Sequence, residues 1–177
     1  LCSLSKNYDS LLMWSYYNCH KGVCIGIDLE KADKYLSRIW GTIILGYLKF
    51  EVRYRDIIEK PDFFKREEDL WTYQLSTKGK VWEHEQEVRL VIVEPSMMTP
   101  YYVPKEFDKK EIVDYKEIRF VPKIGGECFN SVYLGVNIDD DIKKQIINTA
   151  KRLNPEVKIY QMKVDANAFK LQTESII

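Results

Sequence analysis

The most informative pattern in the chain is the stretch KVWEHEQEVRLVIV at residues 80–93. Charged and apolar side chains alternate along it, with Glu83, Glu85, Glu87 and Arg89 in one set and Val88, Leu90 and Ile92 in the other. Because successive side chains of a strand point to opposite faces, the alternation predicts a strand over 81–93. Carboxylates side by side on one face must be solvated, paired with cations or functional. A buried glutamate there could act as an acid, a base or a stabiliser of a developing cation, and a solvated strand face is the structural alternative.

The segments before this stretch carry both helix and strand patterns. Helices are predicted around Leu11–Trp14, over Leu29–Trp40 and over Leu70–Leu75, and strands over Val23–Ile27 and Leu45–Tyr54. Asp9 or Ser10 is the expected cap of the first helix. The second helix is amphipathic, and the second strand alternates from Leu48 onward, which is typical of a strand with one solvated face.

The segments after this stretch add mostly strands. We expect a proline-containing loop over Pro95–Pro104, strands over Ile118–Val121, Ser131–Gly135, Val157–Met162 and Ala168–Leu171, and a helix over Asp139–Leu153. Strands outnumber helices, and they do not alternate regularly with them. The pattern therefore predicts an α+β fold with a mixed, mostly antiparallel sheet, or sheets, and a few flanking helices.

Size and composition favour one folded domain over residues 1–177. Hydrophobic residues make up 45% of the 177, which is enough for a core. Lys plus Arg and Asp plus Glu number 27 each, so no overall charge draws the protein to nucleic acid or to an anionic membrane. The chain begins at Leu1 and enters a dense motif at once, which we interpret as a piece that lacks its N-terminal part.

Cysteine and hydropathy patterns narrow the class further. The four cysteines form no C-x-x-C pair, and two histidines are too few to complete a typical zinc site, so no metal is expected. No apolar run approaches the roughly 20 residues that cross a bilayer, and no secretory signal is present. These patterns predict a cytoplasmic protein with reduced thiols that does not bind membranes.

The first twenty-two residues hold a second candidate site. Hydroxyl, aromatic and cationic side chains gather there, at Ser3, Ser5, Trp14, Tyr17, His20 and Lys21. Such groups suit a ligand that combines phosphates or a ribose with a flat ring. The structural alternative is that Ser5 caps a helix, Trp14 and Tyr17 belong to its core face, and His20 ends it.

These two motifs together resemble a bacterial family of domains of unknown function, DUF2971. Its members carry a Ser-Leu-Ser start, Leu-Met-Trp-Ser-His-Tyr, His-Lys-Gly, and later Lys-x-x-x-Trp-x-x-Glu-x-Glu-x-Arg. The matching residues here are Ser3-Leu4-Ser5, Leu12-Met13-Trp14-Ser15, Tyr17, His20-Lys21-Gly22, Trp82, Glu85, Glu87 and Arg89. Tyr16 departs from the pattern, because many relatives have His at that position.

The order of the motifs resembles that of ADP-ribosyltransferases, and this resemblance implies a split-sheet fold and NAD as substrate. It implies that Ser3 and Ser5 contact the ribose and that Tyr17 stacks. It also implies that Glu87 is the catalytic glutamate and Glu85 the preceding acid of the pair. The remaining cofactor-binding candidates are Trp14, His20, Lys21 and Arg89. The first transferase motif, a His or Arg on an early strand, would precede Leu1.

Three functions follow as hypotheses. The first is an NAD-consuming or ADP-ribosylating enzyme, used in phage defence or as a toxin, with a protein or nucleic acid as acceptor. The second is a non-enzymatic regulatory domain that binds a nucleotide or a nucleic-acid end, with Glu85 and Arg89 as a structural ion pair. The third is a nuclease in which Glu85 and Glu87 bind a metal ion.

Overall fold

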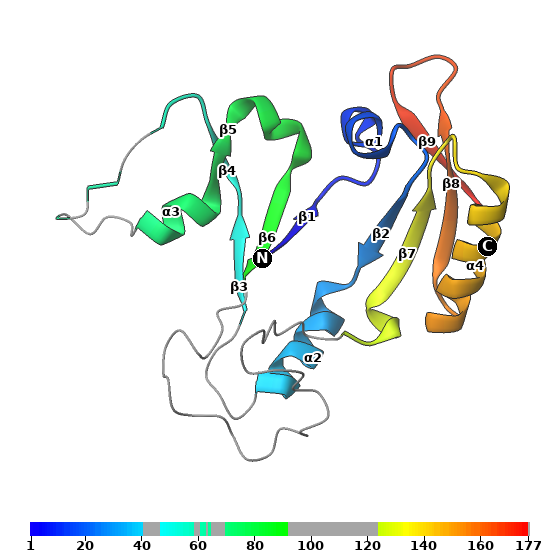
Figure 1. Cartoon of the computed structure of the whole chain (residues 1–177), viewed down its shortest axis with the longest axis horizontal. Coiled ribbons are helices and arrows are strands. Elements are labelled where there is room, and N and C mark those ends of the chain that lie inside the picture. The colour runs from blue at the N-terminus through cyan, green and yellow to red at the C-terminus, as the bar shows by residue number, and fades with distance from the viewer. Residues whose placement is uncertain (41–46, 59–60, 63, 65–69, 92–123, 177) are drawn as a thin grey trace, which may run out of the picture.

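The computed structural model describes residues 1–40, 47–58, 61–62, 64, 70–91 and 124–176. Figure 1 shows the chain with its elements labelled. In chain order they are β1 (Cys2–Ser5), α1 (Leu11–Asn18), β2 (Val23–Ile27), α2 (Leu29–Trp40), β3 (Leu48–Glu51), β4 (Arg53–Arg55), α3 (Leu70–Ser76), β5 (Thr77–Gly79), η1 (Lys80–Glu85), β6 (Glu87–Val91), η3 (Gly126–Cys128), β7 (Phe129–Leu134), α4 (Asp140–Leu153), β8 (Lys158–Val164) and β9 (Leu171–Ser175). None of the described helices is long and apolar enough to cross a membrane.

The described strands form three sheets. One has the order β1-β6-β3 and is wholly antiparallel, a second has the order β2-β7-β8-β9 with only β7 and β8 parallel, and β4 and β5 form a short parallel pair. In Figure 1 the β1-β6-β3 sheet and α3 lie on one side, the four-stranded sheet and α4 on the other, and α1 between them. The predicted α+β class with mostly antiparallel sheets is confirmed.

The two faces of the four-stranded sheet carry separate apolar clusters. On the face covered by α4, the buried residues are Val132, Leu134, Val157 and Ile159, and the helix contributes Ile146, Ile147 and Ala150. The second cluster joins Trp14 of α1 to Met162 and Leu171 of the sheet. Burial of these side chains removes apolar area from water, which is the main favourable term in folding. The sheet is thus held by a helix on each side.

Helix caps begin α1 and α4, and the cap of α1 is one of the two residues that the sequence predicts. The Ser10 hydroxyl accepts the Met13 N–H at 3.4 Å and begins α1. The Asp139 carboxylate accepts the N–H groups of Asp141 and Ile142 at 2.9 and 3.1 Å and begins α4. Both caps satisfy N–H groups that have no partner within the helix.

Several predicted elements are confirmed, with small shifts at their ends. They are the strand Val23–Ile27, the amphipathic helix Leu29–Trp40, the helix at Leu70, and the strands near Ser131 and Val157. The predicted strand 45–54 appears as β3 and β4, separated by the buried Val52. The predictions for 92–93, for Pro95–Pro104, for Ile118–Val121 and for the first two residues of the 45–54 strand fall outside the described residues.

Two predicted strands begin later than expected. Residues 80–85 form the 3₁₀ helix η1, which ends when Gln86 adopts a left-handed conformation (φ 45°) and donates its N–H to the Glu83 carbonyl oxygen. Local hydrogen bonds therefore override the alternating pattern until Glu87, where β6 begins. The strand predicted over 168–171 begins only at Leu171, because the preceding residues form a tight turn in which Lys170 N–H donates to Ala168.

The core of the four-stranded sheet gives a direct stability test. Ile159 is fully buried on β8, so Ile159→Ala should lower the free energy of unfolding by about 2–5 kcal/mol through lost burial and a cavity. Val164→Ala, on the same strand but largely exposed, serves as the control and should change it by less than about 0.5 kcal/mol. Urea denaturation followed by circular dichroism measures both. Equal effects would contradict the assigned core.

Candidate functional site

The antiparallel pairing of β1 with β6 brings the two sequence motifs together. Ser3 lies opposite Arg89, and Ser5 lies opposite Glu87. The Ser5 hydroxyl also donates to the main-chain oxygen of Glu85 at 2.7 Å, which ties the end of β1 to the end of η1. Residues from the start of the chain and from its middle therefore share one site.

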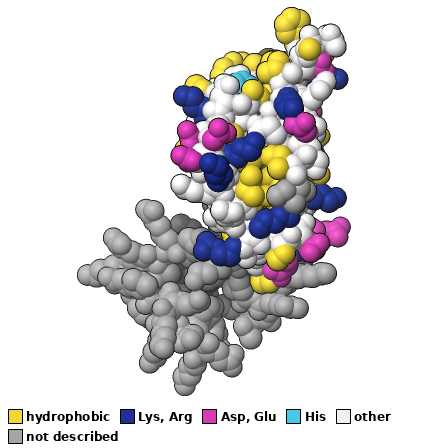
Figure 2. Space-filling model, turned by 90° about the vertical axis from the view of Figure 1, so that its right-hand side faces the viewer, with side chains coloured by type: hydrophobic (Ala, Val, Ile, Leu, Met, Phe, Trp, Pro, Cys, Tyr) yellow, Lys and Arg dark blue, Asp and Glu magenta, His cyan; other side chains and the backbone are white. Residues whose placement is uncertain are grey.

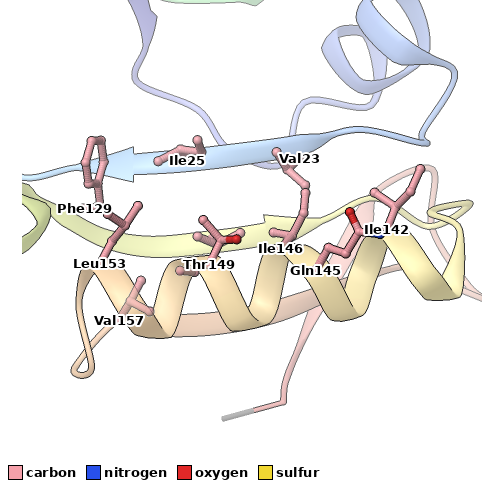
Figure 3. Close-up of a pocket in the computed structure, with 11 residues that line it drawn as sticks. Val23, Ile25, Phe129, Ile142, Gln145, Ile146, Thr149, Leu153 and Val157 are labelled. Atoms are coloured by element: carbon pink, nitrogen blue, oxygen red, sulfur yellow. The ribbon is translucent and has the colours of Figure 1, made fainter.

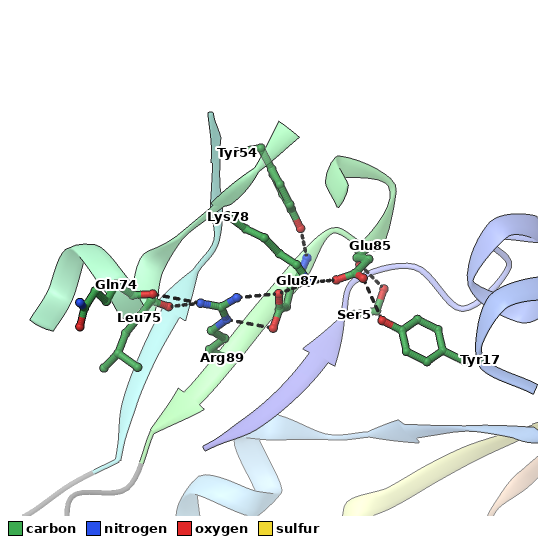
Figure 4. A network of polar contacts seen from close by, with 9 residues as sticks. All are labelled: Ser5, Tyr17, Tyr54, Gln74, Leu75, Lys78, Glu85, Glu87 and Arg89. Carbon is green, nitrogen blue, oxygen red and sulfur yellow. Dashed lines mark hydrogen bonds and ion pairs between the residues drawn. The ribbon is translucent and has the colours of Figure 1, made fainter. Parts of the chain in front are cut away.

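Arg89 holds the Glu87 carboxylate in a fixed orientation (Figure 4). The guanidinium donates to both oxygens, with Nε at 2.9 Å from Oε1 and Nη2 at 3.1 Å from Oε2. Its Nη1 donates to the main-chain oxygens of Leu75 at 2.9 Å and Gln74 at 3.3 Å, near the end of α3. A forked contact of this kind fixes direction as well as charge, and the negative end of a helix favours a cation.

Lys78, from the short strand β5, bridges the two glutamates. Its ammonium contacts Glu85 Oε2 and lies 3.1 Å from Glu87 Oε2. The other oxygen of Glu85 accepts the Tyr17 hydroxyl of α1 at 2.9 Å. Both carboxylates are buried, with 4% of Glu85 and 7% of Glu87 exposed. Two buried carboxylates this close need a shared cation, and Lys78 supplies it.

These contacts shift the pKa values of the site in opposite senses. Burial alone would raise the pKa of Glu87, but hydrogen bonds from Arg89, Ser3 and Lys78 outweigh burial and lower it to about 2. Burial alone would lower the pKa of Lys78, but its bonds to Glu85 and Glu87 raise it. The bond to Glu85, together with burial, raises the pKa of Tyr17. At neutral pH Glu87 is therefore ionised and Lys78 is charged.

Aromatic rings border the carboxylates and remain open to solvent. Tyr17 is 65% exposed although its hydroxyl is bound, and Trp82 is 42% exposed. The Lys78 ammonium lies 5.4 Å from the centre of the Trp82 ring, which is a cation–π contact. The neighbouring Tyr16 packs edge-on against His84 at 6.0 Å and so joins α1 to η1. The site combines charge, hydroxyls and exposed flat rings.

Of the candidate residues, the structure brings Ser3, Ser5, Tyr17, Glu85, Glu87 and Arg89 together. Trp14 lies in the core against Met162 and Leu171 and donates its indole N–H to the Tyr8 carbonyl oxygen at 2.7 Å. His20 lies just past the end of α1, where its Nε2 is 2.9 Å from the Ser15 hydroxyl. Lys21 is exposed at the following turn.

Two site residues were not anticipated from the sequence. Lys78 bridges the carboxylates, and the Tyr54 hydroxyl accepts the Glu87 main-chain N–H at 2.7 Å. A signal for Lys78 existed, since a lysine four residues before Trp82 fits the Lys-x-x-x-Trp part of the family pattern. Tyr54 had none, because its contact depends on the position of β4 beside the start of β6, which is 33 residues later.

A second feature is an apolar groove of about 450 Å³ between α4 and the strands β2 and β7. Val23, Ile25, Ile142, Ile146 and Leu153 are among its lining residues (Figure 3). On this side of the molecule hydrophobic side chains are exposed among charged ones (Figure 2). None of the side chains that line the groove is ionisable, so this groove offers no group for acid–base chemistry.

Comparison with known proteins adds no relative: no family model, no curated protein and no solved structure matches this chain. Within the described residues, no group of three or more His, Cys, Asp or Glu side chains is arranged to hold a metal ion.

The lowered pKa of Glu87 predicts a specific dependence of stability on pH. Glu87→Gln removes one partner of a buried ion pair and should cost about 3–5 kcal/mol of unfolding free energy at neutral pH. Because the folded-state pKa is about 2 and the ordinary value is 4.5, the stabilisation is complete above pH 4.5 and is lost as the pH falls toward 2. The difference in unfolding free energy between wild type and Glu87→Gln, measured by urea denaturation, should therefore become smaller at acid pH.

The control for this measurement is Glu83→Gln. Glu83 carries the same charge on η1, but its side chain is exposed. The unfolding free energy of Glu83→Gln should equal that of the wild type at every pH. If the difference in unfolding free energy between wild type and Glu87→Gln stays constant down to about pH 3, that result would contradict an ionised, paired Glu87.

Proposed function

We propose that this protein is an NAD-consuming or ADP-ribosylating enzyme whose site is the carboxylate pair Glu85 and Glu87. The observation that carries the proposal is the buried, ionised Glu87 on β6, hydrogen-bonded by Ser3 of the paired strand β1. A Ser-x-Ser strand beside a Glu-x-Glu segment is the arrangement that the resemblance to ADP-ribosyltransferases implies. Membership of the DUF2971 family and a role in phage defence or as a toxin belong to the same proposal.

The chemistry needs negative charge near the reacting ribose. The bond between ribose C1′ and the nicotinamide nitrogen breaks, and its electron pair leaves with neutral nicotinamide. Positive charge develops on the ribose ring, and a fixed carboxylate nearby lowers the free energy of that transition state. Water or a nucleophile on an acceptor then bonds to C1′ and loses a proton. Glu85 and Glu87 supply the charge, and Ser3 or Ser5 would contact ribose hydroxyls.

The surroundings of the pair suit a dinucleotide. Tyr17 and Trp82 offer exposed rings on which a nicotinamide or adenine ring could stack. The separation of the strands into the sheets β1-β6-β3 and β2-β7-β8-β9 is compatible with an ADP-ribosyltransferase-like split sheet. Cytoplasmic NAD is the substrate that we expect, with a protein or nucleic acid as acceptor.

One observation favours the alternative of a non-enzymatic nucleotide-binding domain. Arg89 forms its ion pair with Glu87, not with Glu85 as the hypothesis had it, and also joins β6 to α3, so a purely structural role accounts for the contact. Nucleotide binding that survives the loss of the carboxylates would support that alternative. A metal-dependent nuclease is less well supported, because the Lys78 ammonium occupies the position between the two carboxylates where a cation would bind.

The test is a calorimetric titration of the protein with NAD, with nicotinamide release followed in the same samples. Wild type should bind NAD and release nicotinamide. Loss of a charge that stabilises the transition state should slow release by about a hundredfold or more in Glu85→Gln, in Glu87→Gln, or in both. The control Glu83→Gln should match wild type. Absence of binding and release in wild type, or unchanged release in both variants, would contradict the proposal.

A further inference from the structure

The two carboxylates of the site differ in how fully they are bound. Glu87 accepts from Arg89 through both oxygens and from Lys78 through Oε2, and Ser3 adds a further hydrogen bond. Arg89 is itself anchored on the carbonyl of Leu75 at 2.9 Å. A carboxylate offers about four lone-pair positions. Those of Glu87 are therefore occupied by the protein, and its direction is set by α3.

The Glu85 carboxylate can accept more hydrogen bonds than the described residues donate to it. Among the described residues, its Oε1 accepts one hydrogen bond, from Tyr17 at 2.9 Å, and its Oε2 accepts one, from Lys78. Each oxygen keeps a lone pair for a further donor. Tyr17 links Glu85 to the solvent-exposed aromatic border of the site, whereas the Glu87 carboxylate points toward Arg89 and α3 (Figure 4).

We infer that Glu85, and not Glu87, is the carboxylate that contacts the ribose of bound NAD, with Tyr17 as its partner. The inference rests on the proposed function and reverses the roles that the motif order implies. Glu87 is then a positioning residue: it fixes Lys78, and Lys78 holds the Glu85 carboxylate in place.

The charges around the pair explain why the two glutamates should respond differently to substitution. Without the charge of Glu85, Lys78 still has Glu87 as a partner at 3.1 Å. Without the charge of Glu87, Arg89, whose side chain is 14% exposed, loses its anionic partner and Lys78 loses one of two. Loss of a partner from a buried ion pair is strongly destabilising. Loss of the Glu87 charge should therefore lower the stability of the fold more, and loss of the Glu85 charge should slow nicotinamide release more.

The first experiment compares Glu85→Gln with Glu87→Gln, at a temperature where circular dichroism shows both to be folded. Glu85→Gln should lower kcat/KM for nicotinamide release by about a hundredfold or more. Glu87→Gln should lower Tm further than Glu85→Gln and reduce release less. A folded Glu87→Gln that loses as much release as Glu85→Gln would overturn the assignment.

The second experiment uses neighbouring tyrosines of α1. Tyr17→Phe removes only the hydroxyl that donates to Glu85 and should lower kcat about tenfold or more while KM changes little, because the exposed ring remains. Tyr16→Phe removes a hydroxyl from the adjacent residue and keeps its ring packed on His84, so it should match wild type. Combined with Glu85→Gln, Tyr17→Phe should add no further loss, and an additive loss would contradict their pairing.

The outcomes separate this inference from the proposed function. If wild type neither binds NAD nor releases nicotinamide, the proposed function fails. The order of Tm values then still tests the positioning role of Glu87, since that order needs no ligand. A Tm for Glu85→Gln at or below that of Glu87→Gln would overturn the inference even if the enzyme proves active on NAD.

Discussion

The guanidinium of Arg89 lies between the Glu87 carboxylate and the last carbonyl groups of α3, and this contact joins a strand of the sheet to a helix. Burying such charges costs several kcal/mol each in lost hydration, so the contact is stable only if every group finds a partner. Arg89 has the carboxylate and two carbonyls, and the carboxylate has a second cation in Lys78. The position of β5, which carries Lys78, is thereby linked to that of β6.

Helix α1 connects this ionic region to the apolar core. Trp14 points into the cluster of the four-stranded sheet, whereas Tyr17, one turn later, reaches Glu85. A short helix thus touches both the core and the site. Because Trp14 is fixed by close packing and by its bond to the Tyr8 carbonyl oxygen, the orientation of the whole helix, and with it that of Tyr17, is set from the core side.

Local patterns predicted most of the fold, whereas local turns account for the wrong strand predictions and long-range contacts for the unforeseen site residues. A few neighbouring residues encode the cap at Ser10 and the periodicity of the helix Leu29–Trp40. Both could therefore be predicted from the sequence. Within the strand predicted over 81–93, residues 81–85 instead belong to η1, because its hydrogen bonds and the left-handed Gln86 override the alternating pattern. The motifs anticipated six residues of the site, but the bridge through Lys78 appeared only once β5 and β6 were placed.

The pairing of β1 with β6 also determines when the site can form during folding. Ser5 bonds to the carbonyl oxygen of Glu85, which is 80 residues later, and β2 pairs with β7, which lies farther still along the chain. Contacts between such distant segments require large loops to close, and topologies rich in them fold slowly. During synthesis the hydroxyls and aromatic rings of β1 and α1 must wait for β6 to emerge before the site can form. A nascent chain that ends before β6 therefore cannot carry an assembled site, because Glu87 and Arg89 are still missing from it.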